Sequence, residues 1–201
     1  MKIEDLTELE MLGEIRALLN SKNGVLDKKI ELKLENITLA SRFYGLLQET
    51  SKLKILIKYS ISKNFGEHKI YTVTIPNQKG YKEFLNRLNG ITNSIIISHD
   101  ELLRGTIRGY FLYSGYLKDP KKEYAMDFFI DSQDSADELH SLLLALDKKA
   151  FQALKKSKYL VYLRNSEDIM DILVSMGSLQ EFFKYEETTI IKDLKIKLLE
   201  K

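Results

Sequence analysis

The sequence predicts a mixed α/β fold of the α+β kind, in which an α-β-β-α-β-β-α unit occurs twice with pseudo-twofold symmetry. Three observations lead to this prediction. Similar residues recur at a nearly constant spacing, strand-like segments alternate apolar and polar side chains, and each copy begins with a helix that carries two small residues. We place the first repeat at residues 1–95 and the second at 96–201, together forming one compact pseudo-dimeric unit.

The repeat is visible as three groups of matching residues in the same order. Each member of a group is followed 88 to 96 residues later by an identical or similar residue. The groups are Gly13 and Ala17 with Gly105 and Gly109; Ala40, Leu46 and Leu47 with Ala136, Leu142 and Leu143; and Tyr71, Val73, Ile75 and Asn77 with Tyr159, Val161, Leu163 and Asn165. This order indicates a duplication whose loops have since changed in length.

The strand-like segments alternate with a period of two. In 29–35, Ile30, Leu32 and Leu34 alternate with charged residues, and 53–61 repeats the pattern. Such alternation is typical of antiparallel sheets that helices cover on one side only. We therefore expect two half-sheets that form a saddle, each with a solvated concave face. We also expect the helix 166–176 to begin with Ser166 as its N-cap.

The first helix of each copy carries small residues one turn apart, at Gly13 and Ala17 and at Gly105 and Gly109. Small residues allow two helix backbones to approach closely, whereas glycine in an exposed helix costs about 1 kcal/mol relative to alanine. We expect these two helices to pack against each other along the pseudo-twofold axis. The alternative is that Gly105 and Gly109 are only tolerated there.

The composition excludes several classes of protein and of site. Hydrophobic residues make up 44% and charged residues 30% of the 201 residues, as in globular proteins that bury a core. No apolar run approaches the roughly 20 residues of a membrane span, and acids stand where a signal peptide would be apolar. The absence of cysteine excludes disulfides and thiolate metal sites. We expect a cytoplasmic protein without a membrane contact; a net charge of +2 says little about nucleic acid.

Two segments resemble a known family. They read LRGTIRGYFLYSGYLKDPKKEYAMDF and LVYLRNSEDIMDILVSMGSLQEFFKYEETTIIKDL. The repeated helix, glycine and strand resemble the LAGLIDADG homing endonuclease fold, and the segments resemble more closely the WhiA family of bacterial sporulation and cell-division regulators. The resemblance covers about residues 9–194 and is stronger in the second repeat. In that family a degenerate LAGLIDADG region precedes a C-terminal helix-turn-helix. Here none follows, so either the protein lacks one or the sequence is an excised domain.

The resemblance also identifies the positions where a nuclease of this fold holds its metals. One carboxylate stands at the end of each central helix, directly before a glycine, and binds the divalent ions that activate water. These degenerate acid positions are Asn23, before Gly24, and Ser114, before Gly115. Neither residue is anionic, and the three histidines lack metal-ligand spacing. We expect no catalytic residue, no metal and no cofactor, and hence no enzyme.

Candidate DNA contacts are basic residues assigned to the polar faces of the strands and to a hairpin turn. They are Lys29, Lys33, Lys54 and Lys58 in the first repeat and Lys155, Lys156, Lys158 and Arg164 in the second. On a concave sheet, several would face the same groove of DNA. The alternative is ordinary solvated lysines, since Glu31 and Glu35 interleave with the first set.

We therefore expect a catalytically inactive LAGLIDADG-like domain of a WhiA-type DNA-binding transcription regulator, monomeric, with DNA as its partner. The alternative, from another functional class, is a protein-interaction scaffold. In that case the saddle contacts a protein partner, and a different module binds DNA. An active endonuclease is the third hypothesis. The salt dependence of DNA binding separates the first two, because contacts to phosphate impose a steep fall with salt.

Overall fold

A computed structural model of the chain describes residues 2–22, 24–26, 28–62 and 68–199. The chain divides into two compact units, one formed by residues 2–113 and the other by Ser114–Lys201. Among the described residues, no helix combines the length and the apolar character needed to cross a membrane.

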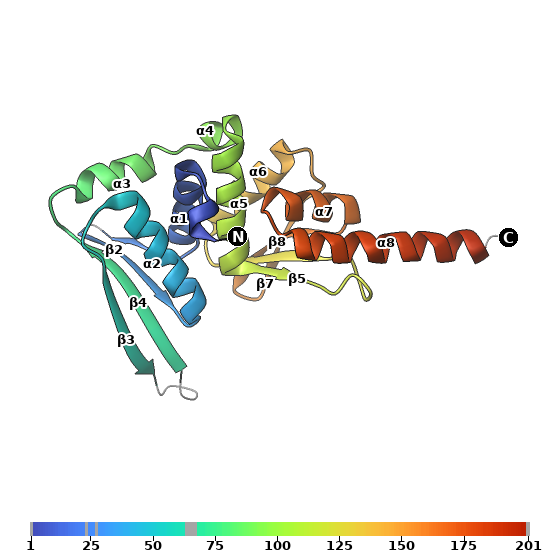
Figure 1. Ribbon diagram of the computed structural model, residues 1–201, viewed down its shortest axis with the longest axis horizontal. Coiled ribbons are helices and arrows are strands. Elements are labelled where there is room, and N and C mark those ends of the chain that lie inside the picture. The colour runs from blue at the N-terminus through green and yellow to red at the C-terminus, as the bar shows by residue number, and fades with distance from the viewer. Residues whose placement is uncertain (1, 23, 27, 63–67, 200–201) are drawn as a thin grey trace. The chain divides into compact units, whose positions relative to one another are not determined.

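Residues 2–113 contain the first copy of the unit and two further helices (Figure 1). After a short 3₁₀ turn η1 (Ile3–Asp5), the elements are α1 (Glu8–Ser21), β1 (Val25–Leu26), β2 (Lys29–Leu34), α2 (Ile37–Ser51), β3 (Leu56–Ser62), β4 (His68–Pro76), α3 (Tyr81–Asn89), α4 (Asn93–Ser98) and α5 (Asp100–Ser114). The strands form an antiparallel sheet in the order β1-β2-β4-β3.

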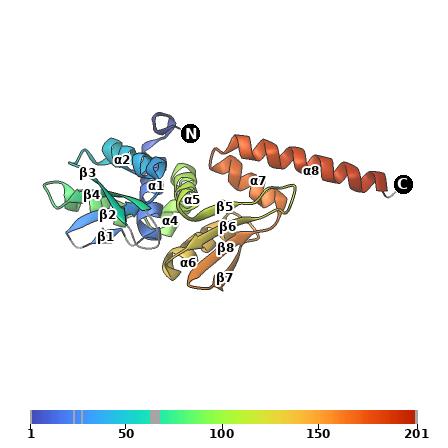
Figure 2. The ribbon, with the colours of Figure 1, turned by 90° about the horizontal axis from the view of Figure 1, so that it is seen from below.

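The second unit repeats this pattern after α5. Its elements are β5 (Gly115–Leu117), β6 (Met126–Ile130), α6 (Gln133–Ala145), β7 (Phe151–Lys155), β8 (Lys158–Leu163), α7 (Ser166–Ser175) and α8 (Leu179–Leu199). Figure 2 shows its sheet with the strand order β5-β6-β8-β7, which is antiparallel and equivalent to that of the first sheet. The predicted fold class, with its order α-β-β-α-β-β-α in each copy, is confirmed.

The core of each unit is built from the residues that recur between the copies. In the first unit Val73 lies opposite Leu32, and Ile75 lies opposite Ile30. In the second, Val161 lies opposite Phe128, and all of these side chains are buried. The helices that cover the two sheets bury the remaining recurring residues, namely Ala40, Leu46 and Leu47 in α2 and Ala136, Leu142 and Leu143 in α6. The spacing in the sequence therefore reflects one packing arrangement used twice.

The edge strand β3 differs from its prediction. It begins at Leu56, three residues later than the alternation suggested, and Ile57, Tyr59 and Ile61 on its apolar side are about half exposed. The reason is that α2 packs on β2 and β4, and β3 lies at the outer edge of the sheet. Lys54 precedes the strand, where Gln78 binds its backbone at both N–H and C=O, so the placement of Lys54 on a strand face was wrong.

Helix starts follow local capping rules. Thr7 and Glu10 form a capping box at the start of α1, with reciprocal bonds to each other's backbone N–H. The N-cap of α7 is Asn165, whose side chain accepts from Asp168 N at 3.0 Å. The prediction of Ser166 was therefore one residue late. The 21-residue helix α8 was not predicted; Tyr185 is buried, but six of its other large apolar side chains are exposed.

Candidate nucleic-acid interface and central helices

Helices α1 and α5 lie in backbone contact at their small residues. A Cβ atom added to Gly105 would lie 2.1 Å from Glu10 O, and one added to Gly13 would lie 2.5 Å from Leu102 O. At Gly109 an added Cβ would meet Glu14 O at 2.7 Å and the Cβ of Ala17 at 2.8 Å. Each distance is shorter than a van der Waals contact, so the spacing between these helices requires glycine.

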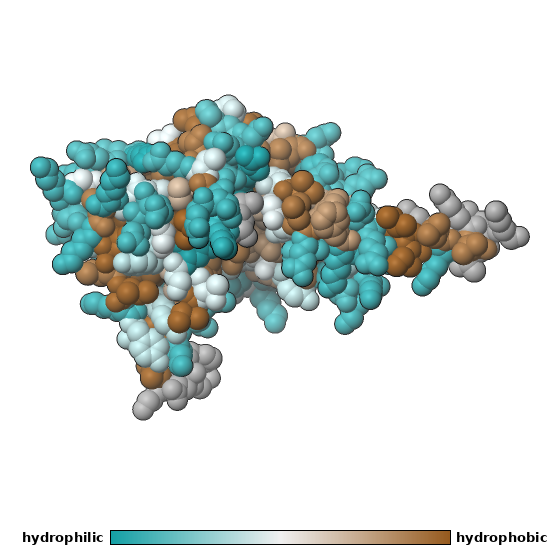
Figure 3. All heavy atoms as spheres, in the orientation of Figure 1, coloured by the Kyte–Doolittle hydropathy of each residue, from teal (hydrophilic) through white to brown (hydrophobic). Residues whose placement is uncertain are grey.

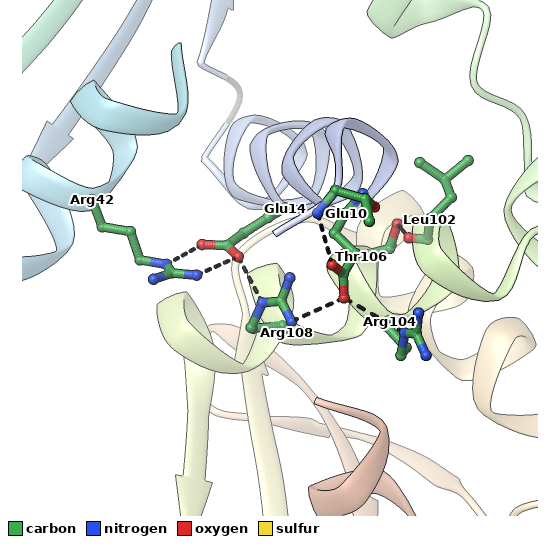
Figure 4. Close-up of polar contacts among 8 residues, drawn as sticks. Glu10, Glu14, Arg42, Leu102, Arg104, Thr106 and Arg108 are labelled. Atoms are coloured by element: carbon green, nitrogen blue, oxygen red, sulfur yellow. Dashed lines mark hydrogen bonds and ion pairs between the residues drawn. The ribbon is translucent and has the colours of Figure 1, made fainter. Parts of the chain in front are cut away.

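A buried ion network accompanies this contact (Figure 4). The carboxylate of Glu14 is fully buried and accepts from Arg42 Nε and Nη2 and from Arg108 Nε, the last at 2.8 Å. Glu10 lies 3.7 Å from Arg108 and 3.5 Å from Arg104. Two carboxylates of α1 thus face two guanidinium groups of α5 and one of α2, which leaves the network with a net charge of +1.

Sequence reasoning missed these five residues. The signal was present, because Glu10 and Glu14 stand four residues apart beside Gly13, and Arg104 and Arg108 stand four residues apart beside Gly105. Residues four apart share a helix face. The two acids on one helix and the two arginines on the other have the same four-residue spacing as the small residues. This pattern indicates that the two helices pack against each other.

The ends of α1 and α5 carry the degenerate acid positions. Ser114 is the last residue of α5 and is buried, whereas Asn23 lies outside the described residues. Their neighbours in the chain, Lys22 and Tyr113, meet, with Lys22 Nζ 5.0 Å from the centre of the Tyr113 ring. The Lys22 ammonium therefore lies over the ring of the residue that precedes Ser114 in the chain.

Across the described residues, no three histidine, aspartate or glutamate side chains gather as metal ligands. His140 Nε2 lies 3.1 Å from Ala150 O, and His99 Nδ1 lies 3.0 Å from Ile95 O, which are structural contacts. Asp119, the acid nearest to Ser114 in the second repeat, accepts a bond from Lys121 N within a turn.

The first sheet carries three candidate lysines on the face turned away from α2. Lys33 and Lys58 lie in one cross-strand row with Thr72 between them, and Lys29 is on the same face. Lys29 Nζ lies 2.5 Å from Glu31, and this hydrogen bond holds the pKa of the Glu31 carboxyl below its usual range. Glu31 is therefore anionic near neutral pH and offsets part of the positive charge.

In the second sheet the candidate cations differ in their contacts with carboxylates and aromatic rings. Arg164 is bound to Asp127 at 2.7 Å and lies over the ring of Tyr162, and Lys158 lies 3.1 Å from Asp131. Lys155 lies over the Phe129 ring at 5.7 Å. Lys156 is exposed at the tip of the β7–β8 hairpin, where its φ of 58° shapes a two-residue turn.

The face of this sheet turned away from α6 is also aromatic, which sequence reasoning did not identify. The register places Tyr116, Phe129, Tyr162 and Phe151 there, and Phe151 stacks on Tyr162 with ring centres 5.4 Å apart. Tyr116 and Phe151 are half exposed. The alternation of residues 126–130, with Phe129 between buried neighbours, was the available signal. The face offers aromatic rings bordered by lysines.

Comparison with known proteins agrees with this architecture. Residues 103–195 match the family model of the WhiA LAGLIDADG-like domain. A probable cell division protein WhiA from Clostridium botulinum (strain Hall) is 24% identical over 207 residues, which cover 95% of this chain and 66% of the relative. The chain thus spans just under two thirds of that relative's length.

Solved structures share the fold at low sequence identity. Full-length WhiA from Thermatoga maritima superposes with a TM-score of 0.69 at 14% identity, over 96% of this chain and 68% of that one. The homing endonuclease I-DmoI in complex with its target DNA gives a TM-score of 0.60 at 13% identity, over 85% and 95% of the two chains.

Proposed function

We propose that this chain, which carries the WhiA LAGLIDADG-like domain over residues 103–195, is a catalytically inactive, DNA-binding domain of a transcription regulator. The observation that carries the proposal is the β7–β8 hairpin. It presents Lys155, Lys156 and Lys158 at the edge of the aromatic sheet face, and only Lys158 has a carboxylate contact among the described residues.

Such a face suits the phosphate backbone of DNA. Lysines that neutralise phosphates release counterions, and exposed aromatic rings add contact area without requiring a particular base sequence. The I-DmoI complex supports DNA as the partner, because a protein of this fold is seen there with its target DNA.

Inactivity is supported by the ends of the central helices. A nuclease of this fold would need anionic ligands where Ser114 and Asn23 stand. Neither residue is anionic, and the Lys22 ammonium lies over the ring of Tyr113, the residue before Ser114. The expected binding is therefore sequence-tolerant and without cleavage.

The test is duplex DNA binding across a salt series. Replacing Lys155, Lys156 and Lys158 together by Gln should lower the slope of log affinity against log salt by about 2 to 3, at roughly 0.9 per lost phosphate contact. The matched control replaces three other exposed lysines, Lys79, Lys82 and Lys184, by Gln and changes net charge equally. Equal slopes for the hairpin variant and the wild type would refute contact through this hairpin.

A second candidate function, a protein-interaction scaffold, is favoured by one specific observation. The edge strand β3 exposes Ile57, Tyr59 and Ile61, which is unusual for side chains on the apolar side of a sheet. Absence of DNA binding even at low salt would favour this function over the first.

A further inference from the structure

The aromatic rings of the second sheet lie in two neighbouring rows on the face turned away from α6. One row crosses all four strands of the sheet in Figure 2 and consists of Phe151, Tyr162, Asp127 and Tyr116. Residues two apart along a strand share a face, so Phe129 lies in the next row, about 7 Å away. All of these residues belong to the unit Ser114–Lys201, so its own fold brings the rings together.

The rings at the two ends of the longer row are the most accessible. Phe151, on the edge strand β7, stacks on Tyr162 with ring centres 5.4 Å apart and an interplanar angle of 24°, yet it is still 50% exposed. Tyr116, on the edge strand β5, is 55% exposed. An exposed ring presents a flat apolar surface that another ring covers well, because aromatic groups stack. The two edges therefore offer open surfaces for planar groups.

The middle of this row is held in place by Arg164. Its guanidinium carbon lies 4.5 Å from the centre of the Tyr162 ring, and its Nη1 donates to Asp127 Oδ1 at 2.7 Å. The carboxylate of Asp127 is therefore paired with a cation. Side chains that are already ordered lose less entropy when a ligand binds, so this arrangement favours binding.

Positive charge is concentrated at the hairpin beside these rings. On and next to the face, five cations stand against three carboxylates, a net charge of +2, and the groups are Lys118, Lys155, Lys156, Lys158 and Arg164 with Glu123, Asp127 and Asp131. In the described part of the chain, the carboxylates contact Lys118, Lys158 and Arg164, so the excess charge belongs to Lys155 and Lys156. Lys155 Nζ lies 5.7 Å from the centre of the Phe129 ring, so its ammonium reaches back toward the rings.

We propose that this face binds single-stranded DNA, with unpaired bases stacked on Phe151 and Tyr116 and backbone phosphates near Lys155 and Lys156. The proposal rests on the DNA-binding function proposed above and names the form of DNA that the face prefers. In a duplex, neighbouring bases cover one another and only base edges are open in the grooves, so protein rings cannot stack on them. Unpaired bases expose their faces, and their stacking on aromatic side chains tolerates any base sequence.

Fluorescence anisotropy with a labelled, pyrimidine-only DNA strand of about 15 nucleotides measures this binding, and the same strand annealed to its complement provides the duplex. At low salt the single strand should bind at least about tenfold more tightly than the duplex, because stacking adds to the phosphate contacts. Phe151→Leu and Tyr116→Leu each remove a ring and keep an apolar side chain, and each should weaken single-strand binding at least about fivefold. Phe151→Tyr keeps the ring and should retain the wild-type affinity.

The control is an exposed phenylalanine outside the sheet. Exposed apolar side chains also lie along α8 (Figure 3), where Phe183 is 59% exposed. Phe183→Leu makes the same chemical change as Phe151→Leu and should leave both affinities unchanged. Circular dichroism verifies that each variant is folded. Because Phe151 and Tyr116 lie on separate edge strands, either Leu variant tests the proposal if the other does not fold.

Three outcomes would overturn the proposal. Equal affinities for the single strand and the duplex, with no effect of either Leu variant, would refute base stacking and leave the hairpin as a contact for duplex DNA. Tighter binding of the same strand made as RNA would assign the face to RNA. No binding of either form of DNA at low salt would refute this proposal together with the DNA-binding function on which it rests.

Discussion

Gly105→Ala tests the close contact between α1 and α5 with the smallest possible change. The added methyl group would lie 2.1 Å from Glu10 O and 2.7 Å from Glu10 C, which are backbone atoms that no rotamer change can move. The helices must separate by about 1 Å to restore a normal contact. Overpacking of this kind costs about 1–3 kcal/mol, and separation also stretches the Glu14–Arg108 bond.

The helix propensity of alanine would offset about 1 kcal/mol of that cost. We therefore expect a net loss of about 2 kcal/mol in the free energy of unfolding and a Tm lower by roughly 4–8 °C, measured by urea and thermal unfolding with circular dichroism. Gly45→Ala is the control, since its Cβ would meet only the flexible end of Ile3, and it should be neutral or stabilising. If Gly105→Ala melts at or above the wild-type temperature, the packing argument is wrong.

Three further predictions follow from the central helices and α8. Glu14→Gln removes the buried carboxylate that binds both Arg42 and Arg108 and should cost about 3–5 kcal/mol in chemical unfolding, whereas an unchanged midpoint would contradict the network. Burial raises the pKa of Tyr185 to about 12, so the unfolded tyrosine, with a pKa near 10, ionises first. The free energy of unfolding should therefore fall between pH 10 and 12, and Tyr185→Phe should remove this component. Plasmid DNA with Mg²⁺ should stay uncut by the wild type and by the Asn23→Asp, Ser114→Asp variant.

The repeat, the two sheets and the small-residue contacts could be predicted from the sequence because each depends on a regular spacing. Core residues such as Val73 and Val161 recur with the strands that bury them, and Gly105 has few reasons to stand inside a helix except close packing. Each of these features is a regular spacing of residue types, so periodicity and the internal repeat are sufficient to find them.

What the sequence did not reveal depends on partners far apart in the chain. Arg42 and Arg108 reach the same carboxylate from α2 and α5, and alternation cannot show that they meet. The exposure of Ile57 follows from the position of β3 at the edge of the sheet, which its own alternation does not encode. Arg164 reads as an available cation until its bond to Asp127 is seen.

Positive charge near the end of α5 bears on whether a metal ion could bind there. Ser114 stands six residues after Arg108, about 9 Å along the helix, and Lys22 lies against the neighbouring Tyr113. A divalent cation at the end of α5 would lie within about one Debye length of the buried ion network, which has a net charge of +1. We expect Lys22→Gln, added to the Asn23→Asp, Ser114→Asp variant, to strengthen Mg²⁺ binding in a direct calorimetric titration. An equal affinity with and without Lys22 would show that the ammonium does not matter.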